Sequence, residues 1–149
     1  MTAFVLISVP VLGAGTFVAM LSGTQEVPPV NSVATGEAVF TLSPDGTTLT
    51  YRVTVANLSG AVASHIHIAP VGVNGPVAVP LFSGSIPGPF TGVLAEGIIT
   101  SASLTGPLLG MPLDALIAEI SAGRAYVNVH TLTNPGGELR GQVMLQVLP

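Results

Sequence analysis

The histidines of this chain are the side chains whose type and spacing could do chemistry. His65 and His67 are two residues apart in the segment 63–68, where alternating isoleucines favour a β-strand. Side chains two apart on a strand point to the same face, so both imidazoles share one face while Ile66 points to the other, toward the core. The spacing therefore predicts two imidazoles side by side on an outward strand face.

The third and last histidine, His130, lies in a second predicted strand over residues 126–131. It alternates with Val127 and Val129, so it also faces away from the core. If the two strands are neighbours in one sheet, three imidazoles converge, and imidazole nitrogen is a ligand that suits copper and zinc. The alternative interpretation is three surface histidines that form hydrogen bonds with nearby loops.

Polar residues on the same strands or in nearby segments could support such a site. The candidates for contacts behind the metal ligands are Asn128, Glu138, Arg140 and Glu26. Residues 138, 140 and 142 share one strand face. We interpret Glu138, Arg140 and Gln142 as a solvated strand face with a Glu–Arg pair.

Composition excludes several classes of function. Only 7% of the residues are charged, lysine and arginine together number three, and the formal net charge is −4. Without a basic patch we expect no nucleic-acid partner. Cysteine is absent, which removes disulfides and cysteine-based metal sites. No small-molecule substrate is evident, and so few charges predict that some apolar surface faces a partner.

Residues 1–15 form an uncharged apolar arm that precedes the rest of the chain. Val5, Ile7, Val9 and Val11 alternate with other residues as in a strand. Pro10 disfavours a helix. We expect this arm to serve as a donor strand that pairs with another copy of the chain. A membrane anchor over residues 1–21 is the alternative.

The remainder, residues 16–149, is predicted to be one all-β domain. Short strands with turn residues between them are expected at 17–21, 37–42, 47–56, 63–68, 77–82, 90–99, 126–131 and 138–147. Leucine and isoleucine at helical spacing over residues 112–122 predict one short helix. This pattern is typical of an antiparallel sandwich or barrel.

Four segments, in order, carry a resemblance to a known family: residues 21–30 (LSGTQEVPPV), 63–67 (ASHIH), 126–131 (YVNVHT) and 134–142 (NPGGELRGQ). Together they resemble the CHRD domain family, named for chordin and widespread in secreted or surface proteins of bacteria and archaea. The resemblance covers about residues 16–147. It implies an immunoglobulin-like antiparallel β-sandwich outside the cytoplasm, at the cell surface or secreted.

Three functions follow as hypotheses. The first is a non-enzymatic structural subunit that polymerises into a fibre or surface assembly by exchange of the arm, with or without a histidine metal site. The second is a secreted monomeric module that binds copper or zinc through His65, His67 and His130. The third is a small metal-dependent secreted enzyme, for which no proton-transfer partner is evident. We expect the chain not to be an enzyme.

Overall fold

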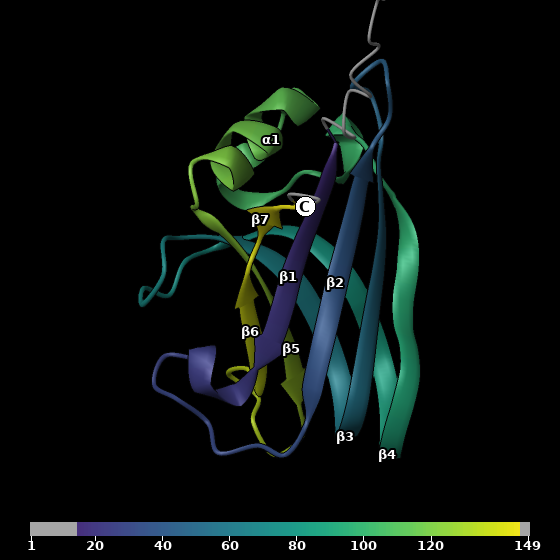
Figure 1. Cartoon of the computed structure of the whole chain (residues 1–149), viewed down its shortest axis with the longest axis vertical. Helices are drawn as coiled ribbons and strands as arrows, with labels where there is room; N and C mark the ends of the chain where they lie inside the picture. Colours follow the sequence, from purple (N-terminus) through teal and green to yellow (C-terminus); the bar gives the residue numbers. More distant parts are fainter. Residues whose placement is uncertain (1–14, 147–149) are drawn as a thin grey trace, which may run out of the picture.

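The computed structural model describes residues 15–146 as an antiparallel β structure with one α-helix (Figure 1). Its strands are β1 (Thr16–Ser22), β2 (Thr35–Leu42), β3 (Leu49–Ile68), β4 (Val77–Ile99), β5 (Ala125–Thr131), β6 (Leu139–Gln142) and β7 (Met144–Leu145). Helix α1 spans Leu113–Ser121, and short 3-10 turns occupy Gly23–Gln25, Ser101–Ser103 and Gly106–Leu108. The all-β class and the helix predicted over 112–122 are thus confirmed.

Five strands close into a ring rather than forming two separate sheets. The antiparallel pairs run from β1 to β2, β3, β5, β6 and back to β1. Strand β4 lies outside this ring on β3, and β7 lies on β1. The expected immunoglobulin-like sandwich is therefore corrected to a closed five-stranded barrel with two outside strands.

The length of β3 explains the closure. Its first half, Leu49 to Ala56, pairs with β2, and its second half, Ala61 to Ile68, pairs with β5. Between the halves the ladder shifts register, and Asn57 and Gly60 have φ angles of 58° and 73°. Bulges of this kind bend a strand without ending it, so one strand joins what would otherwise be two sheets. The separate strands expected at 47–56 and 63–68 are one strand.

Strand β4 corrects the sequence interpretation in the same way. Residues 77–82 and 90–99 were expected to form two strands, yet Val77–Ile99 pairs with β3 over its whole length. The connecting residues, which include Pro87 and Gly88, stay extended because they follow the long β3 beside them. Proline is compatible with this position because β4 lies outside the ring.

The inward side chains of the barrel form the core. Alternate residues of β1 are buried, as expected for a period of two, whereas nearly all of β5 is buried because loops also cover its outer face. Helix α1 covers one end near β5 and β7, where Leu116 and Ile120 are buried (Figure 1). The outward face of β3 and β5 is left for the histidines.

Residues 1–14 and 147–149 lie outside the described part of the chain. The donor-strand arm predicted over 1–15 and most of the alternative anchor over 1–21 therefore remain predictions, as does the division at residue 16. Residues 16–22 belong to β1. Across residues 15–146, none of the helices has the length and apolar character needed to span a bilayer.

Candidate metal centre

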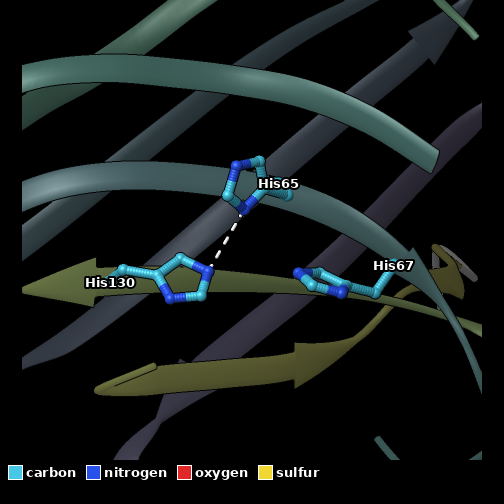
Figure 2. A group of neighbouring side chains, drawn as sticks. All are labelled: His65, His67 and His130. Carbon is cyan, nitrogen blue, oxygen red and sulfur yellow. Dashed lines mark hydrogen bonds between the residues drawn. The ribbon is translucent and has the colours of Figure 1, made fainter. Parts of the chain in front are cut away.

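Three imidazoles converge on the outward face of β3 and β5. These strands are antiparallel neighbours in which Ala63 pairs with His130, His65 with Asn128 and His67 with Tyr126. The pairing brings the rings of His65, His67 and His130 toward one another (Figure 2). One nitrogen from each ring lies within 4.8 Å of the other two. The predicted convergence is therefore present in the structure.

A backbone carbonyl fixes the hydrogen of His67. Its Nδ1 lies 2.8 Å from the carbonyl oxygen of Gly75, in the loop that joins β3 to β4. A carbonyl oxygen only accepts hydrogen bonds, so Nδ1 carries the hydrogen. The other nitrogen, Nε2, of the neutral ring then has a free lone pair. That atom is buried and has no hydrogen-bond partner within residues 15–146.

A second carbonyl acts on His130 in the same way. Its Nδ1 donates to the carbonyl oxygen of Pro135 at 2.8 Å, which leaves Nε2 as the acceptor in the neutral ring. This Nε2 lies 3.1 Å from Nδ1 of His65, so His65 donates to His130. Two of the three rings thus have their lone pairs directed into the cluster by loop carbonyls, an arrangement typical of histidine metal ligands.

The distances in the cluster are close to those of a metal site. Zinc–nitrogen bonds of about 2.0–2.1 Å in a tetrahedral site separate neighbouring ligand nitrogens by about 3.4 Å. The 3.1 Å between His65 and His130 is already near this value. The third ring lies within 4.8 Å, so a shift of at most about 1.4 Å at the nitrogen of His67 would complete the set.

The surroundings of His65 and His67 favour the neutral form of these two rings. Burial, together with the nearby imidazoles of His130 and His67, lowers the pKa of His65 to about 4. Burial also lowers the pKa of His67, whose side chain is only 8% exposed. Metal ions bind the neutral ring. The site is therefore prepared to accept a cation without first losing a proton at these two rings.

Asn128 presents a second unpartnered acceptor beside the histidines. Its side chain is buried between His65 on β3 and Arg140 on β6, which are its register partners. Its Oδ1 has no hydrogen-bond partner in the described residues, like Nε2 of His67. Two lone-pair acceptors cannot satisfy each other, and an unpaired buried acceptor costs about 1–3 kcal/mol. A bound cation would satisfy both atoms, and so would an Asn128 amide turned to donate from Nδ2 to Nε2 of the neighbouring His67.

The interpretation of residues 138–142 as a solvated face was wrong. Arg140 is 1% exposed and donates to the loop after β3, and Gln142 donates to the carbonyls of Ala69 and Gly123. Glu138 accepts hydrogen bonds from Thr131, Asn134 and Ser32. The ion pairs within residues 15–146 are Arg52–Glu96 and Arg124–Glu119, so the expected Glu–Arg pair is not formed. Loops fold over this face, which buries Arg140 and half-buries Glu138 and Gln142.

Two further residues belong to this region. Tyr126, which the sequence analysis did not select, stacks on His67 with ring centroids 4.9 Å apart and an interplanar angle of 7°. Its position two residues before Asn128 and four before His130 could have identified it, since all three share one strand face. Glu26 is buried near Arg140 rather than beside the histidine rings it was expected to support, and burial raises its pKa to about 7.

Comparison with known proteins gives one match. Residues 17–143 match the CHRD domain family. This range includes the three histidines and, apart from Thr16 at the start of β1, every strand of the closed barrel. No match is found among curated proteins or among solved structures.

Proposed function

The chain belongs to the CHRD domain family, and we propose that His65, His67 and His130 bind one copper or zinc ion. The observation that carries the proposal is the fixed orientation of the lone pairs. The carbonyl oxygens of Gly75 and Pro135 hold the hydrogens of His67 and His130 on the outer nitrogens. The inner nitrogens are left to face a ligand.

Metal binding would replace the hydrogen bond between His65 and His130. In the neutral cluster His65 donates from Nδ1 to Nε2 of His130. When the ion takes the place of that hydrogen, His65 carries its own hydrogen on Nε2 instead, and no proton is lost from the ring. Three imidazoles leave a fourth position for water or for Oδ1 of Asn128.

Imidazole ligands limit the choice of metal. Neutral imidazole suits zinc and copper, whereas calcium and magnesium prefer oxygen ligands. We therefore assign copper or zinc, and we assign the module a binding role outside the cytoplasm, without catalytic turnover. The location rests on the resemblance of residues 21–30 and 134–142 to secreted and surface proteins.

Metal content of purified variants tests the assignment. Wild-type protein loaded with excess zinc or copper, then passed through a desalting column, is expected to retain one equivalent. His67→Ala is expected to weaken binding at least 100-fold, because it removes a ligand and its carbonyl partner loses its donor. Glu96→Gln, which removes an exposed carboxylate on β4, serves as the control and should retain the ion. Equal metal content in wild type and His67→Ala would remove the proposal.

We also propose that copies of the chain assemble through the apolar arm, residues 1–15. Two features support this second function. Strand β4 pairs only with β3 in residues 15–146, so its outer edge offers backbone groups to an added strand. The same strand carries a single charged residue, Glu96, and exposes Val93 and Ile98. A long edge with so little charge is the kind of edge that pairs with another chain.

Removal of residues 1–14 tests the assembly. The full chain is expected to form oligomers or filaments by sedimentation velocity and electron microscopy, and the shortened chain is expected to stay monomeric. Val93→Lys places a charge on β4 and should weaken assembly of the full chain. Undiminished polymers after the deletion would refute this function. Metal binding by the shortened chain would show that the two functions are separate.

A further inference from the structure

Arg140 is a buried cation without a carboxylate at ion-pair distance. Its side chain is 1% exposed on β6, and the ion pairs of the described residues do not include it. Its guanidinium instead donates from Nη2 to the carbonyl oxygens of Pro70 and Val73 at 3.1 and 3.0 Å. Burial of a charge is costly unless its hydrogen bonds are satisfied. These carbonyls provide that compensation, and Arg140 in turn holds the loop that supplies them.

The loop held by Arg140 contains the carbonyl that orients His67. Nη1 of Arg140 donates to Oδ1 of Asn74 at 3.3 Å, and Nδ2 of Asn74 donates to the carbonyl of Val27 at 2.7 Å. The next residue is Gly75, whose carbonyl accepts from Nδ1 of His67. A Cβ at position 75 would collide with the backbone of Ile68. The loop can therefore lie this close to the end of β3 because residue 75 is glycine.

A second route joins Arg140 to His67 through an aromatic ring. Cζ of Arg140 lies 3.5 Å from the centroid of the Tyr126 ring, and the Tyr126 ring lies parallel to that of His67. The hydroxyl of Tyr126 accepts from the backbone N–H of Gly75 at 3.1 Å. Tyr126 therefore contacts Arg140, His67 and Gly75, the residue whose carbonyl orients His67. The ring of His67 is fixed both by stacking and by its hydrogen bond.

We propose that Arg140 is a positioning residue of the metal centre, which holds His67 with its hydrogen on Nδ1 and its lone pair toward the other histidines. The effect of Arg140 on metal affinity rests on the proposed function. The effect of Arg140 on the position of the His67 hydrogen is a property of the metal-free protein. The two parts can therefore be measured separately.

Arginine suits this position better than lysine. The guanidinium is planar, so it lies on an aromatic ring and at the same time reaches several acceptors in its plane. A lysine ammonium keeps the positive charge but cannot provide both the stacking surface and the fork. Arg140→Lys thus removes the geometry while it preserves the charge near the cation site.

The experiment measures two properties of Arg140→Lys. Competition with a chromophoric chelator gives the zinc dissociation constant, and two-bond ¹H–¹⁵N spectra of the metal-free protein show which ring nitrogen of His67 carries the hydrogen. We expect zinc binding to weaken about 10- to 100-fold, as for other residues that orient metal ligands. We also expect His67 to populate both tautomers while His130, held by Pro135, keeps its hydrogen on Nδ1. Arg52→Lys, at an exposed ion pair, is the matched control and should change neither property.

A second variant covers the case in which Arg140→Lys does not fold. Tyr126→Phe keeps the stacked ring and removes only the hydroxyl that holds Gly75. It is expected to shift the tautomers of His67 in the same direction and to weaken zinc binding less than the arginine variant. Wild-type tautomers and wild-type zinc affinity in the variants that fold would overturn the proposal. If wild-type protein binds neither zinc nor copper, the proposed function fails, and the tautomers of His67 still decide the role of Arg140.

Discussion

Nδ1 of His65 lies 3.1 Å from Nε2 of His130, across the antiparallel pair of β3 and β5. The two rings share one hydrogen because the outer nitrogen of His130 already donates to the carbonyl of Pro135. In the proposed metal-bound state, a cation between the rings would take the place of this hydrogen. The pair therefore forms a hydrogen bond in this structure and would supply two of the three ligands of the proposed metal site.

The pH at which the metal is released should lie well below that of an ordinary histidine site. Burial and the neighbouring imidazoles lower the pKa of His65 to about 4, and burial lowers the pKa of His67. Protons compete with the metal only when the ring nitrogen can take them up. We expect zinc to be retained at pH 5.5 and released as the pH falls further, measured by dialysis and metal analysis from pH 4 to 7.5. Release centred at pH 6.5, the usual pKa of histidine, would contradict this.

Glu26 should make the domain less stable as the pH rises toward neutrality. Burial raises its pKa from 4.5 to about 7, against the opposing effects of Arg140 and the Val27 N–H. The folded protein therefore keeps this proton between pH 4.5 and 7 while the unfolded chain loses it. The stabilising contribution is full below pH 4.5 and is lost as the pH rises to 7, by up to about 3 kcal/mol.

Urea denaturation of Glu26→Gln at pH 4.5 and pH 7.5 measures this effect. Glutamine keeps the shape of the protonated carboxyl and cannot ionise. The free energy of unfolding of the variant should therefore rise relative to that of the wild type as the pH goes from 4.5 to 7.5. Glu37→Gln, at an exposed position of β2, is the control and should stay within about 0.5 kcal/mol of the wild type. Equal pH dependence in wild type and Glu26→Gln would show that Glu26 does not hold a proton in the folded state.

Two adjacent glycines should respond differently to alanine. Gly137 has a φ of 125°, and a Cβ there would overlap the carboxyl of Glu26. A Cβ at Gly136 meets no atom within 4 Å. We expect Gly137→Ala to lower the free energy of unfolding by about 1–3 kcal/mol through backbone strain, with more from the overlap. Gly136→Ala should change it by less than about 0.5 kcal/mol, and equal losses by thermal denaturation would refute the assigned contact.

Glu138 should act on His130 as Arg140 acts on His67. Its carboxylate accepts from Thr131 and Asn134 through Oε1 and from Ser32 through Oε2, and so holds the loop that contains Pro135. Glu138→Gln replaces one acceptor with a donor, and a buried mismatch costs about 1–3 kcal/mol. We expect the variant to mix the tautomers of His130 and leave His67 unchanged, in two-bond ¹H–¹⁵N spectra. A change confined to His67 would contradict the assignment of Glu138 to the loop that orients His130.

The histidine cluster could be predicted from the sequence because it depends on local periodicity. His65 and His67 are two residues apart, and His130 alternates with valines, so the face of each was readable. That β3 and β5 are neighbours could not be read from the sequence and is shown by the structure. The carbonyls of Gly75 and Pro135 were not predictable, because every residue has a carbonyl and only the path of the loop brings one to a ring.

The barrel and the burial of Arg140 depended on long-range contacts. The sequence analysis expected two strands, 47–56 and 63–68, where the structure has one; Gly60, between them, has a positive φ, but the strand continues to pair. An alternating strand also predicts an exposed outer face, and residues 138–142 follow that pattern. The loop after β3, some seventy residues away in sequence, covers that face. A local sequence pattern cannot predict that a distant loop covers this strand face.

The most direct test of the account is a zinc titration of uniformly ¹⁵N-labelled protein, followed by two-bond ¹H–¹⁵N spectra of the histidine rings. The account predicts that all three rings respond together and are complete at one equivalent of zinc. Nε2 of His67, Nε2 of His130 and Nδ1 of His65 should shift as metal-bound nitrogens, while Nδ1 of His67 and of His130 keep their hydrogens. Independent responses of the rings, or a response that continues well beyond one equivalent, would contradict it.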